Sequence, residues 1–212
     1  MYVPKHFGPE DPAAVIEVIE NFPFATLVTP GADGAPLANH VPIILEDRAA
    51  PKPKLLGHVA RANPMWKALE TSPRVLAIFH GPHAYISPRF YATNDRIPTW
   101  NYAVVQVRGR ARLIQDAQKL EDLIVRLLER FEGEGLGRPH VKMEDDYSQK
   151  LLAGIVGFEI EAESIEHKFK LGQNRDPRDR ESAIHSLERE GTEMDRQLAQ
   201  WMRRFNPERG AR

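Results

Sequence analysis

The chain has no cysteine among its 212 residues. Disulfide frameworks, thiolate nucleophiles and cysteine-ligated zinc sites are therefore excluded. No apolar run approaches the roughly 20 residues that a membrane-spanning helix needs, and residues 1–7 lack the long apolar core of a secretory signal peptide. These absences predict a cytoplasmic protein that makes no membrane contact.

Neither sign of charge is in excess, since 29 lysines and arginines face 30 acidic residues. That balance argues against general attraction to nucleic acid, although it leaves a local basic face open. The chain also lacks a Gly-x-Ser-x-Gly sequence, a Walker sequence, a Gly-x-Gly-x-x-Gly sequence and a His-Glu-x-x-His sequence. Any chemistry would therefore have to come from a bound cofactor.

Short segments rich in β-forming residues follow one another with few helices between the early ones. The sequence predicts strands at 24–29, 36–45, 54–60, 74–80, 84–87, 102–114 and 155–165, and helices after Asp11, after Asp116 and at 145–153. Gly81-Pro82 predicts a turn, and the apolar segment 74–80 predicts a strand buried on both faces. This order favours an α+β, mainly β fold, namely an antiparallel barrel or strongly curved sheet with peripheral helices.

The tail, residues 175–212, has nine arginines, no lysine and eight acidic residues. Its apolar residues Leu198, Trp201, Met202 and Phe205 have helical spacing and need burial. We therefore expect a barrel domain at 1–174 and a helical C-terminal extension at 175–212. The near balance of charge in the extension gives direct DNA binding little support, and no convincing helix-turn-helix is visible.

Residues 57–64, Gly-His-Val-Ala-Arg-Ala-Asn-Pro, begin as a strand and end as the start of a helix. Asn63 suits the N-cap, and Pro64 stands where a missing N–H costs nothing. Arg61 would then lie beside unpaired backbone N–H groups, which is an arrangement that binds phosphate. The alternative, in which Arg61 only pairs with a surface carboxylate, stays open.

Two other groups of residues could contact a ligand. Trp100 and Asn101 offer a π-face and an amide to a flat heteroaromatic molecule, or they only cap the core and a turn. Lys170, Gln173 and Asn174 offer a charge and two amides, or they form a solvated loop. His80 and His83 could approach one metal ion, but two imidazoles make an incomplete set of ligands.

Several segments of the chain together resemble the PaiB family, the FMN-binding negative transcriptional regulators with a split β-barrel. The resemblance covers most of the chain and lies in residues 1–7, 24–29, 40–42, 57–66, 80–88, 98–102 and 170–174. Two departures from the family pattern are Arg89-Phe90-Tyr91 in place of Ser-Trp-Tyr and Gly172 in place of serine.

The resemblance implies a bacterial, cytoplasmic homodimer with each FMN lodged between the subunits. The resemblance places Arg61 and Asn63 at the FMN phosphate, together with His58 in the same segment, residues 58–63. It places His40 and Pro42 at the flavin ring. It further implies cofactor contacts from Trp100 and Asn101 of the partner subunit and from Lys170, Gln173 and Asn174. It implies a transcriptional repressor and leaves direct DNA binding open. The alternatives are an FMN-dependent oxidoreductase of small molecules, or a haem binder using His40, His58, His80 or His83.

Overall fold

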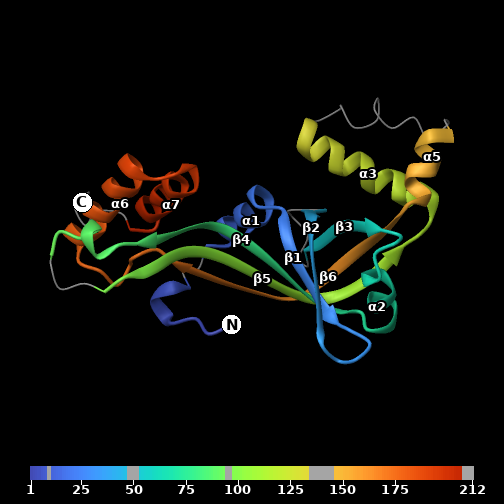
Figure 1. Cartoon of the computed structure of the whole chain (residues 1–212), viewed down its shortest axis with the longest axis horizontal. Helices are drawn as coiled ribbons and strands as arrows, with labels where there is room; N and C mark the ends of the chain where they lie inside the picture. Colours follow the sequence, from blue (N-terminus) through green and yellow to red (C-terminus); the bar gives the residue numbers. More distant parts are fainter. Residues whose placement is uncertain (9–10, 47–52, 94–96, 134–145, 207–212) are drawn as a thin grey trace. The chain divides into compact units, whose positions relative to one another are not determined.

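The computed structural model describes residues 1–8, 11–46, 53–93, 97–133 and 146–206 (Figure 1). Its elements alternate short helices with strands. In chain order they are η1 (Lys5–Phe7), α1 (Pro12–Asn21), β1 (Phe24–Pro30), β2 (Pro36–Leu45), β3 (Lys54–Ala60), α2 (Met65–Thr71), β4 (Arg74–Ile86), η2 (Pro88–Phe90), β5 (Thr99–Ile114), α3 (Ala117–Glu132), α5 (Asp146–Ala153), β6 (Ile155–Lys170), α6 (Pro177–Glu190) and α7 (Glu193–Arg204).

The strands form a closed barrel in the order β1-β2-β3-β6-β5-β4. β1 pairs antiparallel with both β2 and β4, β2 pairs antiparallel with β3, and β3 pairs antiparallel with β6. In the described part of the chain, β1, β2 and β3 follow one another without a helix between them, as antiparallel neighbours can, whereas α3 and α5 lie between β5 and β6. The predicted antiparallel barrel with peripheral helices is confirmed.

The chain divides into two compact units, which we describe separately. The barrel unit contains Ile19–Phe79 and Gln106–Ile165, and the tail unit contains Met1–Val18, His80–Val105 and Glu166–Arg212. The tail unit thus combines both chain ends with a middle segment. The division into a barrel domain at 1–174 and an extension at 175–212 stays a prediction.

Alternation of buried and exposed residues builds the core of the barrel unit. Leu27, Ile43 and Phe158 are fully buried. In β1, the residues directly before and after Leu27 are more exposed than Leu27 itself. Gly57 makes room for the ring of Phe158, since a Cβ at Gly57 would lie 2.5 Å from its Cζ. The interior is therefore filled by side chains rather than by a channel.

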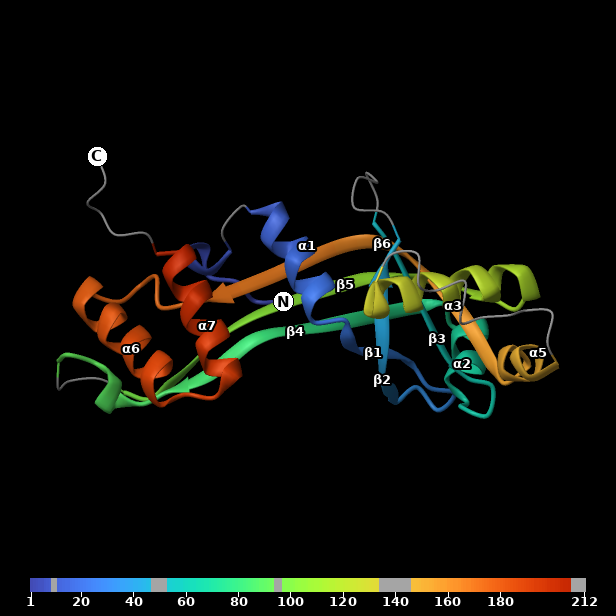
Figure 2. The same cartoon turned by 90° about the horizontal axis from the view of Figure 1, so that it is seen from above.

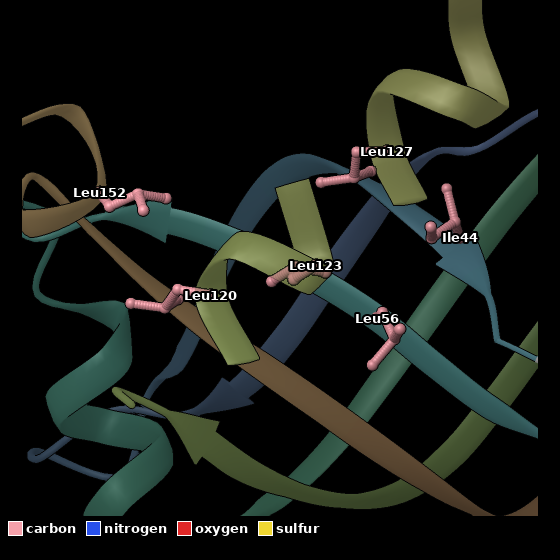
Figure 3. Packing of buried hydrophobic residues seen from close by; sticks show 6 residues of the cluster. All are labelled: Ile44, Leu56, Leu120, Leu123, Leu127 and Leu152. Atoms are coloured by element: carbon pink, nitrogen blue, oxygen red, sulfur yellow. The ribbon is translucent and has the colours of Figure 1, made fainter. Parts of the chain in front are cut away.

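Helix α3 covers one part of the barrel wall. The carboxylate of Asp116 accepts a hydrogen bond from Lys119 N at 3.0 Å and caps the helix as expected. Leucines spaced at helical intervals then face the strands (Figure 3). The cluster contains Leu120, Leu123 and Leu127 of α3 with Ile44 of β2, Leu56 of β3 and Leu152 of α5.

Strand β4 corrects two predictions. It continues through Gly81-Pro82 without a turn, and in residues 74–80 buried positions alternate with more exposed ones rather than being buried on both faces. Gly81 permits the continuation, because a Cβ there would lie 3.0 Å from the carbonyl oxygen of Ala103 in β5. A Gly-Pro pair marks a close approach of two strands here, and the local turn signal is misleading.

The tail unit confirms the helices predicted in the C-terminal extension. α6 and α7 lie side by side (Figure 2). Phe169 of β6 meets Trp201 edge-on at a centroid distance of 5.3 Å and Phe205 at 5.5 Å. Burial of these rings supplies the apolar contact that anchors α7 within the unit.

Candidate functional site

One candidate surface is formed by side chains on the side of β1, β2 and β3 that does not face the barrel interior. Residue pairing places Phe24 opposite Pro42 and Thr26 opposite His40. His58 belongs to the next strand and follows Gly57, which is paired with Ile43. We name these five residues the β1–β3 face: Phe24, Thr26, His40, Pro42 and His58.

The β1–β3 face combines apolar and polar side chains and is partly exposed. Phe24 is 67% exposed, and His40 is also exposed. The Phe24 and His40 rings lie 6.3 Å apart, while Thr26 Oγ1 and His40 Nδ1 are within hydrogen-bond distance at 3.1 Å. Exposed aromatic surface of this kind suits a flat ligand or a protein partner.

His58 carries an unsatisfied polar atom on this face. Its Nδ1 is buried and has no hydrogen-bond partner among the described residues. Burial lowers the pKa of the imidazole, so that the ring is neutral at neutral pH. A neutral imidazole has one donor and one acceptor nitrogen. Since a buried polar atom without a partner is costly, the atom is suited to a ligand with a polar ring edge.

Arg61 lies at the exit of β3 and is held by backbone carbonyl groups. Its Nε donates to Ala153 O at 2.7 Å, and its Nη2 donates to Ile155 O at 2.9 Å. Both acceptors are neutral, and in the part of the chain that the structure describes no carboxylate forms an ion pair with Arg61. The exposed guanidinium therefore keeps an uncompensated positive charge.

Several of the backbone N–H groups that the sequence predicted to be free near Arg61 have acceptors in the chain, which corrects that part of the prediction. The backbone N of Arg61 donates to Gly154 O, and that of Asn63 donates to Ala60 O, both at 2.8 Å. The helix begins at Met65, whose N donates to Asn63 Oδ1 at 3.0 Å. Pro64 rather than the predicted Asn63 occupies the N-cap position of α2, but the side chain of Asn63 still accepts the first helical N–H, that of Met65.

Asn39 is a neighbour of the site that the sequence did not single out. Its Oδ1 accepts a hydrogen bond from Asn63 Nδ2 at 2.7 Å and connects β2 to the turn after β3. With both amide atoms of Asn63 engaged by Asn39 and Met65, this contact orients the turn that presents Arg61. The position of Asn39 directly before His40 was the available sequence signal.

The second group of candidate residues belongs to the tail unit, where Trp100 is 53% exposed. The Trp100 ring lies 6.1 Å from that of Tyr85 and 6.5 Å from that of His83, so three rings form an exposed aromatic cluster. Lys170 Nζ donates to Trp100 O at 2.8 Å and also to Thr99 Oγ1. Burial, and then the charges of Lys168 and Arg175, lower the pKa of Lys170.

The amides of this second group are used within the chain. Asn101 is only 4% exposed, and its Nδ2 lies 3.6 Å from Met202 Sδ. Gln173 accepts from Leu171 N at 2.8 Å and donates to Phe169 O at 2.6 Å. Asn174 is exposed. These contacts give Asn101 and Gln173 a structural role, and their contact with a cofactor stays a prediction.

Among the described residues, no group of three or more His, Asp or Glu side chains could hold a metal ion. No helix in the described part of the chain is both long and apolar enough to cross a membrane.

The barrel unit fits FMN, the cofactor that the resemblance implies. A flavin ring needs a flat, partly apolar surface and a partner for its polar edge, and a phosphate needs positive charge. The β1–β3 face offers Phe24 and Pro42 as surface and the unpartnered His58 Nδ1 as a polar contact. Arg61 offers the charge.

Comparison with solved structures supports the fold. The chain is similar to a flavocytochrome, Anf3, from Azotobacter vinelandii, with a TM-score of 0.61 and 15% identity over 81% of this chain and 73% of the other. It is also similar to an FAD- and haem-binding protein from Mycobacterium smegmatis, with a TM-score of 0.60 and 15% identity over 82% of this chain and 78% of the other.

Comparison of sequences shows the family. The family described as "Putative FMN-binding domain" matches residues 1–164. The chain is 34% identical over 206 residues to protease synthase and sporulation protein PAI 2 from Bacillus subtilis, covering 95% of this chain and 96% of that protein. The chain therefore belongs to the PaiB-type family of FMN-binding domains, and FMN is its cofactor.

Proposed function

We propose that the protein is a homodimeric FMN-binding regulator in which the β1–β3 face receives the flavin ring. His40 and Pro42 form the ring surface, Arg61 holds the phosphate end, and Asn63 orients the turn that presents Arg61. The observation that carries the proposal is that His58 Nδ1 is buried and has no hydrogen-bond partner among the described residues, while Phe24 and His40 on the neighbouring strands are exposed. FMN supplies redox chemistry when bound, whereas the residues of this chain bind and orient it.

Within this proposal the tasks of the residues differ. The neutral His58 ring gives or takes one hydrogen bond at the ring edge, according to its tautomer. Arg61, fixed by two carbonyl oxygens, presents charge without first having to be ordered. Asn63 supports that turn through its contact with Asn39.

Exposed apolar side chains support a dimer. Phe24 is 67%, Trp100 53% and Tyr85 47% exposed. Aromatic side chains of this size contribute strongly when a second protein covers them. We propose that a second copy of the chain covers these surfaces and that Trp100 of one subunit completes the flavin pocket of the other.

The name of the Bacillus subtilis relative refers to a protease synthase and to sporulation, which supports a regulatory role for this chain. The charges of the tail unit favour regulation without DNA contact through α7. Arg203 binds Glu181 and Glu188, and Arg204 binds Asp11 and Glu17. Because these guanidinium groups are neutralised by carboxylates, they are poorly placed to bind DNA phosphates.

A salt titration of binding to DNA tests this part of the proposal. We expect the FMN-loaded protein to show no strong binding to mixed-sequence duplexes even at low salt. Tight binding with a steep salt dependence that Arg203→Gln and Arg204→Gln reduce would contradict it.

FMN titration tests the central proposal. We expect purified protein to bind one FMN per chain and to absorb at about 450 nm, as an oxidised flavin does, and native mass measurement should give a dimer. His58→Leu should weaken FMN binding, while His185→Gln, an exposed histidine on α6, should not. A colourless preparation that fails to bind added FMN would overturn the proposal.

A further inference from the structure

The ring of Trp100 is exposed, but the backbone that carries it is held by other parts of the tail unit. Trp100 is 53% exposed, whereas the next residue, Asn101, is only 4% exposed. Lys170, the last residue of β6, reaches this part of β5: its Nζ donates to Trp100 O at 2.8 Å and also to Thr99 Oγ1. These hydrogen bonds fix the backbone of Trp100 and make no use of its ring.

Helix α7 holds the same part of β5 at Asn101. The Nδ2 of Asn101 lies 3.6 Å from the Sδ of Met202, and both side chains are buried. The end of α7 also holds the loop that follows β6, because Asn206 Nδ2 donates to Leu171 O at 3.0 Å. α7 therefore supports the start of β5 both directly and through the end of β6.

The surroundings of Lys170 do not favour a cation. Burial, and then the charges of Lys168 and Arg175, lower the pKa of its ammonium group. Among the described residues no carboxylate forms an ion pair with it. Its acceptors are instead a hydroxyl and a carbonyl group of β5. Since a long side chain loses conformational freedom when it is held in this way, these two contacts account for its position.

We infer that Lys170 is a positioning residue, which fixes the backbone of Trp100 so that the ring is presented to a partner subunit in one orientation. The inference rests on the proposed function, in which this ring completes the flavin pocket of the partner. A group that is ordered before binding loses less conformational freedom on binding. Lys170 therefore strengthens FMN binding through Trp100, in place of the direct cofactor contact that the family resemblance implies.

Fluorine NMR tests the positioning without FMN. The chain has three tryptophans, Trp66, Trp100 and Trp201, so fluorotryptophan labelling of the full-length protein gives three resonances, and Trp100→Phe assigns one of them. Lys170→Met removes the ammonium donors and should shift or broaden the Trp100 resonance. The Trp201 ring packs edge-on against Phe169, so an unchanged Trp201 resonance shows that the tail unit of the variant is folded.

Lys168→Met is the matched control. Lys168 lies on the same strand, and its Nζ faces the rings of Tyr2 and Tyr102, each at 5.7 Å, rather than the backbone of Trp100. Removal of this charge should leave the Trp100 resonance nearly unchanged. Lys170→Arg keeps hydrogen-bond donors at the end of the side chain, and its Trp100 resonance should lie closer to the wild-type position than that of Lys170→Met.

A double-mutant cycle, measured by FMN titration, tests the connection to the cofactor. Lys170→Met should weaken FMN binding by about fivefold, and Trp100→Ala should weaken it as well. The double variant should bind FMN as Trp100→Ala alone does, because without the ring Lys170 has nothing to orient. If the two losses multiply, the inference is wrong, since Lys170 then acts on FMN independently of Trp100, as a direct contact would.

The outcomes separate this inference from the proposed function. Wild-type protein that does not bind FMN overturns the proposed function, and wild-type affinity in Trp100→Ala overturns the shared pocket. In both cases a selective change of the Trp100 resonance in Lys170→Met still supports the positioning role. A Trp100 resonance that Lys170→Met leaves unchanged, or that Lys168→Met alters to the same extent, overturns the positioning role even where FMN binds as proposed.

Discussion

The candidate residues of the barrel unit and those of the tail unit differ in how far their polar atoms are already used. In the part of the barrel unit that the structure describes, His58 Nδ1 has no hydrogen-bond partner and the acceptors of the Arg61 guanidinium are neutral carbonyl groups. In the tail unit, both amide atoms of Gln173 and the amide nitrogen of Asn101 have partners in the chain. Unsatisfied groups cost stability when no ligand is present, so the barrel unit is the better place to look for FMN.

The comparison also shows why family motifs need a structure to interpret them. Residues 57–66 and 170–174 both contribute to the family resemblance. Segment 57–66 presents the Arg61 side chain to solvent. In segment 170–174, by contrast, the side chain of Gln173 forms hydrogen bonds with the backbone of Phe169 and Leu171. A shared motif can therefore identify either a ligand contact or a residue that holds a loop in shape.

The largest expected effect of a substitution is on FMN binding, at Arg61 in the barrel unit. Arg61→Ala should weaken FMN binding by roughly 1.5–3 kcal/mol, because a charged hydrogen bond to the phosphate is lost. Calorimetric titration measures this change. Arg61 also holds the junction of α5 and β6, so a thermal unfolding curve must accompany it. Unchanged FMN affinity in a folded variant would move the phosphate elsewhere.

The matching change on the tail side should affect stability instead of binding. Gln173→Ala removes the hydrogen bond that Leu171 N donates to the Gln173 side chain and the one that this side chain donates to Phe169 O. It should lower the free energy of unfolding by about 1–2 kcal/mol, as measured by urea denaturation. FMN affinity of the folded variant should stay at the wild-type value, and a selective loss of affinity would give Gln173 a cofactor contact after all.

His58 should make the stability of the FMN-free protein depend on pH. Its pKa is lowered in the folded state by burial, so the unfolded state binds a proton more readily as the pH falls below about 6.5. Stability should therefore decrease with falling pH, at no more than about 1.4 kcal/mol per pH unit from this residue. In His58→Gln this part of the decrease should be missing; identical pH profiles would show that His58 is not responsible.

The smallest expected change in subunit stability is at Trp100. Because about half of its surface is exposed and its ring lies near the exposed rings of Tyr85 and His83, Trp100→Ala should change the free energy of unfolding of the isolated subunit by about 0.5 kcal/mol or less. The proposed dimer should nevertheless dissociate at higher protein concentration, as light scattering over a dilution series would report. Unaltered dissociation would leave Trp100 outside the subunit interface.

The sequence predicted most of the barrel correctly because its strands are governed by local patterns. The alternation of residues in 102–114 predicts one buried and one charged face, and the burial pattern of β5 confirms it. Asp116 caps α3 as predicted. The errors arose where the local signal depends on a distant segment. Gly81-Pro82 is part of a strand because Ala103 lies against it. The backbone N–H groups of Arg61 and Asn63 are used by the carbonyl oxygens of Gly154 and Ala60.

Periodicity, capping residues and a set of short motifs suffice to identify an antiparallel barrel and its family, because each depends on neighbours a few residues away. Such local patterns do not predict which polar atoms lack a hydrogen-bond partner, because a partner can come from any part of the chain. Arg61 finds two of its acceptors more than ninety residues away, whereas His58 Nδ1 finds none among the described residues. Folding therefore determines which candidate groups can still bind a ligand, and the order of residues does not reveal it.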